Sequence, residues 1–519
     1  MSRIFRKIIK NTVIISIGTL LSRILGFVRN ILIARFFGTG PEIESFFVAF
    51  SIPNMFRALA GEGVAESVVV PAISEYAQDK PKKEFYDAAS SVIVIGFFFL
   101  VLLTFLGIIL SLPLVKAIAF GFTKDAEKFY FTVRLTRFLF PYLLFICLGA
   151  IIGGILFVLK KFFAPSFSPA ILNIILIIIL LMLPSYPHSP MGILVAGVLV
   201  AGILQFFCHL LSLLKSGFRF NFNLRIVMSH PVVGKMRSLF IPRLWGVSVY
   251  HLNLLIDRAL ATFSWIVGPG GVAAVFYANN LVQFPLAVFG LSVSRAALPD
   301  LSAFGNNADF SQYKSAFVFS FNNIAFILLP ASVGLAVLSS PIIEVIYLRG
   351  AFDAYSLSIT SKALLFYSLG LFFFGGIRLL VNCFYSLQDT KTPAKTATFT
   401  LGVNIVLSLL LMKPLKIGGL ALASSIAAGF NFIVLYNILN RRLKGFADQK
   451  MWANFFKILA SSLFMGLAVV LAWNKMIVEA KILRLILAIA LGSLVFFISS
   501  FIFRVEQARQ IVKWLRRER

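Results

Sequence analysis

Arginines inside apolar runs are the residues of this sequence with the clearest chemical meaning. Arg23 and Arg29 lie within the first long apolar run, residues 11–37, which is long enough to cross a bilayer. A charge at membrane depth costs between about 3 and more than about 10 kcal/mol, depending on the method, and usually faces a cavity rather than lipid. Each of these arginines is therefore a candidate functional residue.

A third arginine, Arg57, falls in the second apolar run, residues 43–76. Pro53, Gly61 and Gly63 surround it, and these residue types interrupt helices. Irregular backbone at membrane depth is tolerated only where it is buried in protein or lines a cavity. We therefore expect Pro53 to act as a hinge beside a polar cavity.

Together, Arg23, Arg29 and Arg57 predict a cationic cluster that binds an anion. The first two are six residues apart, so they diverge by about 120° on an ideal helix. Gly26 lies between them and would supply a hinge that directs both into one cavity. Glu62 could orient or neutralise one guanidinium. Guanidinium groups suit phosphate, so a phosphate or pyrophosphate ligand is expected. The alternative is snorkelling or pairing between helices.

The second half of the chain carries a different set of polar residues within its apolar runs. Asp257 and Arg258 are adjacent, so they diverge by about 100° on a helix. Asn280 and Asn404 follow in later runs. Asp257 with Asn404 could form a cation site, but a structural hydrogen-bonded network is the interpretation that the residues favour.

Composition indicates an integral membrane protein. Of the 519 residues, 59% are hydrophobic, against about 45–50% in soluble domains. The net charge of +28 does not indicate nucleic-acid binding, because the charges lie between apolar runs, where the positive-inside rule explains them. Cys147, Cys208 and Cys383 lie in or beside apolar runs without metal-ligand spacing, so we expect no metal site.

The apolar runs predict an all-α membrane protein with about fourteen transmembrane helices. The basic N-terminal residues 1–10 precede a run that is too long for a signal peptide, so we expect a retained first helix that starts in the cytoplasm. The distribution of Lys and Arg among the loops then places both termini in the cytoplasm. The expected spans are 11–37, 43–76, 85–115, 127–159, 164–184, 191–215, 238–266, 271–302, 313–339, 356–387, 394–412, 417–441, 452–474 and 482–504.

An internal repeat divides the chain. The separation of Pro71 from Pro299 equals that of Pro165 from Pro393, and each proline lies within a short matching motif. This shared separation, the repeat interval, covers an even number of helices, so the repeats are parallel and form two six-helix lobes. The expected parts are an N-terminal lobe (1–216, helices 1–6), a cytoplasmic interfacial linker (217–237), a C-terminal lobe (238–445, helices 7–12), helices 13 and 14 (446–504), and a basic cytoplasmic tail (505–519).

Two parallel lobes are typical of alternating-access transporters, which hold substrate between the lobes. The sequence contains no catalytic constellation, nucleotide-binding loop or nucleophile elbow, so we expect a transporter rather than an enzyme, without a cofactor. Its energy would come from an ion gradient, from the membrane potential, or from substrate supply.

The sequence resembles the bacterial lipid II flippases, the MurJ or MviN family of the MOP exporter superfamily. The most specific part of the resemblance is the opening stretch Ser22-Arg23-Ile24-Leu25-Gly26-Phe27-Val28-Arg29. The other matching motifs are Phe46–Phe50, Pro53-Asn54 with Arg57, Glu62-Gly63, Tyr277-Ala278-Asn279, Phe284-Pro285, and Tyr385 to Pro393.

The resemblance implies that the chain moves lipid II from the inner to the outer leaflet of the bacterial cytoplasmic membrane for peptidoglycan synthesis. It also implies a monomer that binds lipid II, is surrounded by membrane lipids and works beside cell-wall synthesis and division proteins. The family's essential arginines match Arg23, Arg29 and Arg57. Asn30 and Asn280 depart from the family, which often has aspartate and usually has arginine there, and we hypothesise that Arg258 compensates.

Three alternatives remain at the level of the sequence. A flippase for another polyprenyl-pyrophosphate glycan would share the pyrophosphate chemistry. A multidrug antiporter of the same superfamily would need acidic cavity residues and typically has about twelve helices. A non-transporting scaffold for envelope assembly would not need arginines at membrane depth.

Overall fold

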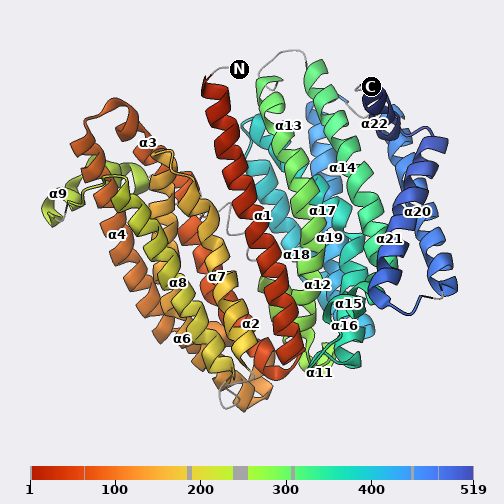
Figure 1. The fold of residues 1–519 in the computed structure, drawn as a ribbon, viewed down its shortest axis with the longest axis horizontal. Helices are drawn as coiled ribbons and strands as arrows, with labels where there is room; N and C mark the ends of the chain where they lie inside the picture. Colours follow the sequence, from red (N-terminus) through yellow and green to blue (C-terminus); the bar gives the residue numbers. More distant parts are fainter. Residues whose placement is uncertain are drawn as a thin grey trace. The chain divides into compact units, whose positions relative to one another are not determined.

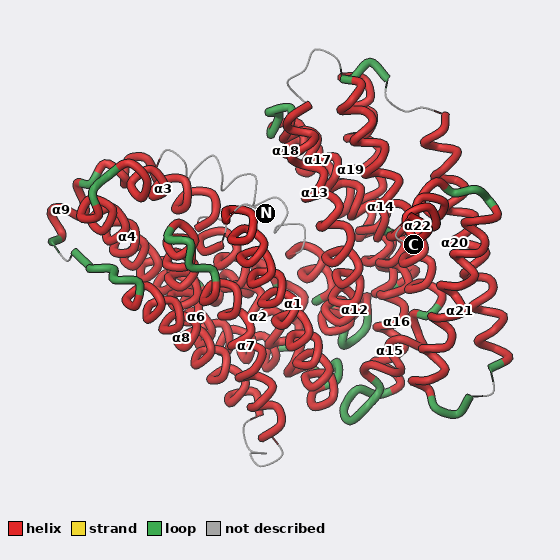
Figure 2. Tube along the Cα trace, turned by 45° about the horizontal axis from the view of Figure 1, so that its top comes forward, coloured by secondary structure: helices red, strands yellow, loops and turns green. Residues whose placement is uncertain are grey.

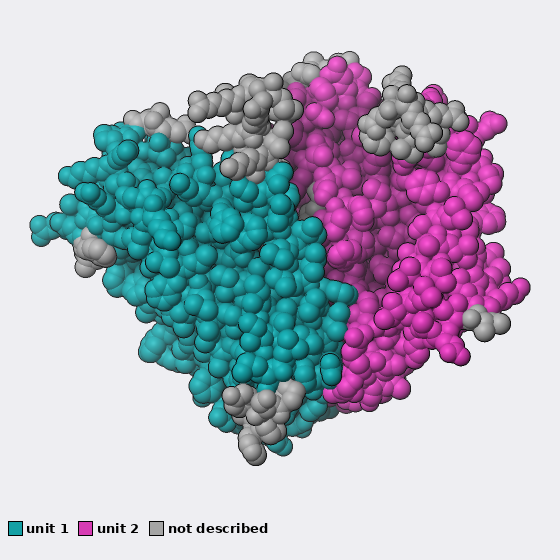
Figure 3. All heavy atoms as spheres, in the orientation of Figure 1, with its two compact units in different colours: residues 1–259 teal, residues 260–519 magenta. Residues whose placement is uncertain are grey.

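The structure is a computed structural model that describes residues 3–62, 65–183, 190–221, 223–237, 255–304, 310–445, 449–476 and 478–517. Within these ranges every regular element is a helix, as the all-α prediction requires (Figure 2). The contacts divide the chain into two compact units, residues 1–259 and 260–519 (Figure 3).

Eleven helices in the described ranges are long and apolar enough to cross a membrane, or twelve if one bent pair counts as a single span. The chain is thus a multi-pass membrane protein. Of the two other expected spans, residues 43–76 change helix type, and most of residues 238–266 lie outside the described ranges. The number fourteen stays a prediction.

Unit 1 is built around one long helix, α6 (Figure 1). The helices α2, α4 and α8 all pack against α6, and α1 packs against α7. The elements of this unit are α1 (Arg3–Phe37), α2 (Pro41–Phe56), the π-helices η1 (Arg57–Glu62) and η2 (Ala65–Val69), α3 (Val70–Asp79), α4 (Lys82–Ile109), α5 (Ser111–Ile118), η3 (Phe120–Lys124), α6 (Ala126–Val158), α7 (Phe163–Met182), α8 (Pro190–Lys215) and α9 (Leu224–Ser229).

A buried ion pair joins α2 to α6. Glu44, in the first turn of α2, accepts a hydrogen bond of 2.6 Å from the Lys128 ammonium, and both side chains are almost fully enclosed. The same ammonium lies 4.0 Å from the ring centroid of Phe122, a cation–π contact that adds to the pair. Breaking a buried pair by removing one partner leaves an uncompensated charge, so this contact fixes the position of α2.

In unit 2, the helices α16, α17 and α18 pack around α19, and α20 packs on α14. The pair α20 and α21 forms a hairpin at the edge of this unit (Figure 1). The elements are α11 (Ser264–Val267), α12 (Gly271–Pro285), the π-helix η5 (Leu286–Gly290), α13 (Leu291–Phe304), α14 (Ser311–Val337), α15 (Ser339–Tyr347), α16 (Ala354–Leu369), α17 (Leu371–Ser386), α18 (Lys391–Leu415), α19 (Ile417–Arg442), α20 (Gln449–Lys475), α21 (Lys481–Ile502) and α22 (Glu506–Arg517).

Element boundaries recur at the repeat interval, the separation of Pro71 from Pro299. Asp125 caps the start of α6, and Asp353, one interval later, caps the start of α16, each accepting from the backbone N–H three residues on. Lys160 and Gln388, separated by the same interval, both have a left-handed backbone, with φ of 60° and 57°. The starts of α7 and α18 and the ends of α4 and α14 also keep this interval. The repeat is therefore a property of the fold.

The two repeats differ at one helix. The span that corresponds to α6 is divided into α16 and α17, which meet at Gly370 with a bend of 43°. A Cβ at Gly370 would lie 2.7 Å from the Ser425 hydroxyl oxygen, so only glycine allows α19 to approach this closely.

Candidate functional site

The first candidate element, α1, is an uninterrupted helix that packs on α7 through small residues. A Cβ at Gly18 would lie 2.5 Å from the Ser166 carbonyl oxygen. One turn later, the Asn173 amide donates to the Ser22 carbonyl oxygen at 2.9 Å. Gly26 also lies beside Asn173, since a Cβ at Gly26 would be 3.6 Å from the side-chain amide of Asn173. The helix continues through Gly26 in this structure, and the hinge expected there stays a prediction.

Arg23 and Arg29 have different surroundings on α1. Arg23 is exposed, whereas Arg29 is half-buried and directed toward its neighbour Asn30. Its Nε and Nη2 donate to the Asn30 amide oxygen at 3.2 and 2.9 Å. Asn30 is only 5% exposed, so its amide is a fixed acceptor that orients the guanidinium. The Asn30 departure noted in the sequence is thus a direct contact of Arg29.

Arg57 lies at the point where α2 changes into the π-helix η1. Pro53 is inside α2, one turn earlier, and lacks the N–H that would continue the regular ladder. Such widened turns are frequent at functional sites. The Arg57 Nε donates to the Asn54 amide oxygen at 2.7 Å, so a second arginine is oriented by a neutral amide. The irregular backbone expected around Arg57 is present.

The rest of this segment is partly described. Glu62 ends η1, and its side chain lies outside the described part of the structure, as does Gly63. A Cβ at Gly61 would lie 3.0 Å from the Cys147 sulfur, so Gly61 brings η1 close to α6. The predicted role of Glu62 stays a prediction.

The candidate residues of the second half are distributed between the two units. Asp257 is buried and Arg258 is half-buried, and the contacts assign both to unit 1. Asn280 donates to the Phe276 carbonyl oxygen of its own helix at 2.9 Å. Asn404 is fully buried in α18, within 3.5 Å of the Ser408 hydroxyl. The predicted cation site of Asp257 with Asn404 would join residues of different units, and it stays a prediction.

The repeat relates the arginine stretch to this second set. The repeat interval separates Arg29 from Asp257, and it also separates Asn30 from Arg258. The same position of the repeat therefore carries a cation in one copy and a carboxylate in the other. Neither copy of this position repeats the charge of the other.

Sequence reasoning named the arginines but missed two amides that hold the elements carrying them. Asn54 and Asn173 carry hydrogen bonds that fix η1 and α1, and neither residue was assigned a role. The available signal was an amide inside an otherwise apolar run, as in Leu172-Asn173-Ile174. A buried amide needs a partner, so such a residue predicts a contact between helices.

The fold, in which element boundaries recur between two units of membrane-spanning helices, is that of a multi-pass membrane transporter. One solved relative by fold is an inward-facing multidrug resistance MATE family transporter of the MOP superfamily, with a TM-score of 0.67, 15% identity, and coverage of 84% of this chain and 98% of that one. At this identity the likeness shows the fold alone.

The particular family follows from the sequence. The model of the family described as lipid II flippase MurJ matches residues 33–491, and the chain belongs to that family. A probable lipid II flippase MurJ of Buchnera aphidicola subsp. Acyrthosiphon pisum is 31% identical over 486 residues, which cover 92% of this chain and 94% of that protein. A solved lipid II flippase MurJ in an inward closed conformation matches with a TM-score of 0.80 at 28% identity, covering 96% of this chain and all of that chain.

Proposed function

We propose that this chain flips lipid II, the undecaprenyl-pyrophosphate-linked peptidoglycan precursor, from the inner to the outer leaflet of the bacterial cytoplasmic membrane. Membership of the lipid II flippase family supports the substrate. The protein is a transporter, and it works by alternating access between its repeated units.

Arg23, Arg29 and Arg57 bind the pyrophosphate in this proposal. The observation that carries it is the way two of these arginines are held. Asn30 orients Arg29 and Asn54 orients Arg57, in both cases through a neutral amide oxygen. These bonds fix the planes of the two guanidinium groups, and the fork of donors on a guanidinium suits a phosphate ligand.

The remaining parts of the proposal concern topology and energy. Both termini lie in the cytoplasm and the protein acts as a monomer. Asp257 and Asn404 provide a Na⁺ site, Glu62, Asn280 and Arg258 contribute to substrate binding, and cell-wall synthesis and division proteins are partners. The hinges act when the protein changes state, so Gly26 and Pro53 are tested by activity rather than by one conformation.

The test is complementation of a bacterium whose own lipid II flippase is depleted, followed by measurement of lipid II accumulating in the inner leaflet. The wild-type chain should restore growth and prevent accumulation. Arg23→Ala, Arg29→Ala and Arg57→Ala should fail at wild-type expression levels. Arg35→Ala on the same helix is the matched control, because Arg35 is exposed and its guanidinium lies over Phe36, 5.8 Å from the ring centroid.

Two outcomes contradict the proposal. Growth of cells carrying Arg23→Ala and Arg57→Ala together would remove the arginines from the substrate site. A wild-type chain that is expressed in the membrane but leaves lipid II in the inner leaflet would contradict the substrate. Flipping of a different polyprenyl-pyrophosphate glycan in proteoliposomes would then identify the alternative.

A further inference from the structure

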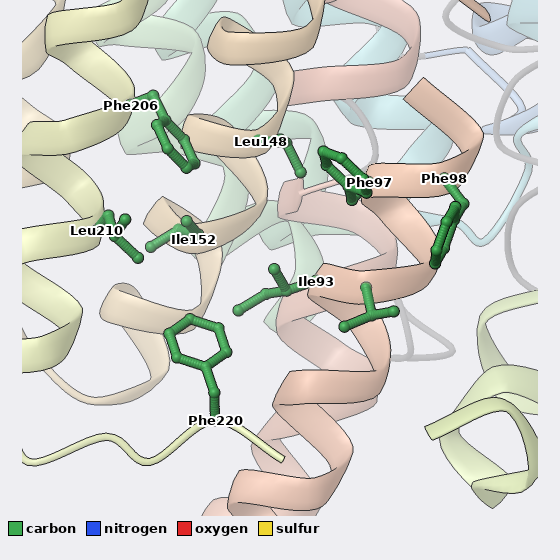
Figure 4. A pocket seen from close by; sticks show the side chains of 9 residues that line it. Ile93, Phe97, Phe98, Leu148, Ile152, Phe206, Leu210 and Phe220 are labelled. Carbon is green, nitrogen blue, oxygen red and sulfur yellow. The ribbon is translucent and has the colours of Figure 1, made fainter. Parts of the chain in front are cut away.

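An apolar groove opens on the surface of unit 1, away from the arginines of α1. Its volume is about 440 Å³, within the range of small-molecule sites. Figure 4 shows side chains from α4, α6 and α8 around it, with Phe220 reaching in from the chain after α8. All nine lining residues are apolar: Ile93, Val94, Phe97, Phe98, Leu148, Ile152, Phe206, Leu210 and Phe220.

The helix arrangement explains why a groove exists. Both α4 and α8 pack against α6, so α6 forms the floor and the other two helices form the walls. The mouth lies on the outer face of α4, where Phe97 and Phe98 are 41% and 54% exposed. The exposed apolar side chains continue along α4 through Leu102 and Phe105, a face that hydrocarbon must cover.

A short strap, residues 217–221, fixes the end of the groove. The Tyr86 hydroxyl of α4 donates to the Gly217 carbonyl oxygen at 2.9 Å. Asn221 donates from its backbone N–H to the Ser90 hydroxyl at 3.0 Å and from its side chain to Asp87 at 2.8 Å. The buried ring of Phe218 packs edge-on against Phe220. The strap therefore holds the Phe220 ring in place at the end of the groove.

Positive charge surrounds this end of unit 1. Arg219 is exposed next to Phe220, and Lys215 is exposed in the last turn of α8. Arg225 follows on α9, a short helix packed on α4, together with the exposed apolar side chains of Ile226 and Met228. A segment with this mixture lies at a membrane surface and attracts anionic lipid headgroups.

Two acidic groups of the same end, Asp87 and Glu84, are engaged with protein partners. Asp87 accepts from the Asn221 side chain, and Glu84 lies 3.8 Å from the Lys80 ammonium. Lys82 and Lys83 add two more exposed cations at the start of α4. The local charge therefore favours an anionic headgroup.

The depth of the groove matches a lipid whose headgroup lies at this charged end. Leu210 and Phe206 precede Lys215 by five and nine residues, so they lie about 7 and about 13 Å along the helix from it. This is the depth of the upper part of an acyl chain below its phosphate. We propose that the groove is a binding site for an anionic phospholipid, with one acyl chain against Phe220 and its phosphate beside Lys215 and Arg219.

The experiment uses the full chain in nanodiscs that contain phosphatidylglycerol with a photoactivatable group in the acyl chain. After irradiation, labelled peptides are identified by mass spectrometry. Label is expected on the stretches that contain residues 93–98 and 206–210. Ile152→Trp fills the floor and should abolish this label, whereas the matched control Ile178→Trp, on an exposed position of α7, should leave it unchanged.

The headgroup is tested separately with phosphatidylcholine carrying the same acyl probe. Phosphatidylglycerol should label the groove more strongly, and Lys215→Gln and Arg219→Gln should each reduce that preference by about fivefold. If Ile152→Trp does not elute as a single species in size-exclusion chromatography, Val94→Trp at the groove wall takes its place. The assay measures lipid contact, so its result is independent of flipping activity.

Three outcomes would overturn the inference. Equal labelling by both headgroups would leave only unspecific lipid packing. Labelling that survives both Ile152→Trp and Val94→Trp would show that the acyl chain binds outside the groove. Displacement of the label by added lipid II, and not by added phosphatidylglycerol, would assign the groove to the tail of the transported lipid.

Discussion

Asn30 fixes the direction of Arg29 although the two residues are neighbours on one helix. Adjacent residues point about 100° apart, and side chains that face each other are usually three or four residues apart. The length of arginine overcomes this, because its Nε and Nη2 reach back to the Asn30 amide oxygen. At the residue scale, the sequence could therefore locate the cations but could not predict which side chains hold them.

Asn30 should act as a positioning residue for Arg29. Asn30→Leu keeps the branched shape of the side chain and removes both hydrogen bonds, so Arg29 loses its orientation, and flipping of lipid II in proteoliposomes should fall by about tenfold or more. Asn30→Asp keeps an acceptor oxygen in the same place and should retain activity within a few-fold of the wild-type rate.

The comparison of Asn30→Asp with Asn30→Leu separates an effect on the orientation of Arg29 from an effect on folding. Both variants should unfold within a few degrees of the wild-type temperature in detergent, because one helix position is altered and the branching of its side chain is kept. If Asn30→Leu flips lipid II at the wild-type rate, the bond between Asn30 and Arg29 has no functional role.

The contact of α1 with α7 depends on glycine at one position more than at another. A Cβ at Gly18 would lie 2.5 Å from the Ser166 carbonyl oxygen, which is backbone and cannot move alone. A Cβ at Gly26 would lie at an ordinary 3.6 Å from Asn173. Gly18→Ala should thus destabilise the protein by about 1–3 kcal/mol, while Gly26→Ala should be neutral or slightly stabilising.

Thermal unfolding in detergent checks this pair of substitutions, with each variant serving as the other's control. Equal stability of the two variants would contradict the packing account. The flipping rate adds a second readout, because a hinge at Gly26 would be impaired by alanine even when stability is unchanged.

The carboxylate of Asp389 holds the loop between α17 and α18 through several contacts, which we call the Asp389 clamp. Asp389 accepts from the backbone N–H groups of Lys391 and Thr392 at 3.1 and 2.9 Å, and from the Arg442 guanidinium at 2.8 Å. Burial raises the pKa of Asp389, but the Thr392 bonds and the Arg442 charge outweigh it, so the pKa lies below its usual 3.8. The ionised carboxylate is thus the form that the fold favours.

The lowered pKa gives a pH dependence with a definite sign. Stability from this clamp is fully present above the unfolded pKa of about 3.9 and is lost as the pH falls through the folded value, which lies below 3.8. Asp389→Asn should lower the unfolding temperature at neutral pH, and its difference from wild type should vanish as the pH falls below that window. A difference that is constant with pH would show that ionisation of Asp389 contributes nothing.

Helix positions were the most predictable elements, and helix irregularities were the least. Long apolar runs indicated the spans, and Pro53 with its glycines indicated an irregularity near Arg57 that the structure contains as a π-helix. The bend at Gly370 has no such signal, because it depends on the approach of Ser425 from another helix. Gly26 lies within an uninterrupted helix in this structure, so its role as a hinge stays a prediction.

At the scale of the whole molecule, the repeat is visible in sequence and structure alike. Two short motifs set the repeat interval, and helix caps and left-handed residues follow it. Charge does not follow it, as Arg29 and Asp257 show. The fold is thus shared by both halves, whereas the three arginines that we propose to bind the anion lie in the first half. Local residue types show this difference, and the periodicity of the chain does not.

The membrane potential acts on transport through the charges that have crossed the membrane at the end of a cycle. In one complete cycle the protein returns to its starting state, so the displacements of Arg23, Arg29 and Arg57 cancel. Only lipid II has moved, and an interior-negative potential favours outward movement of its negative charge. In sodium-free proteoliposomes, the outer-to-inner ratio of lipid II at equilibrium should rise by about fiftyfold per 100 mV for each negative charge carried.

The arginines should change the kinetics of flipping and leave its equilibrium unchanged. Their charges would move in the electric field of the membrane both when the protein carries lipid II and when it returns empty. Arg→Gln variants that retain activity should therefore alter the voltage dependence of the initial rate. The voltage dependence of the final ratio should equal that of the wild-type protein, since the charge of the substrate is the same. A final ratio whose voltage dependence changes with Arg57→Gln would mean that another ion moves with lipid II, and repeating the measurement with Na⁺ on one side would identify it.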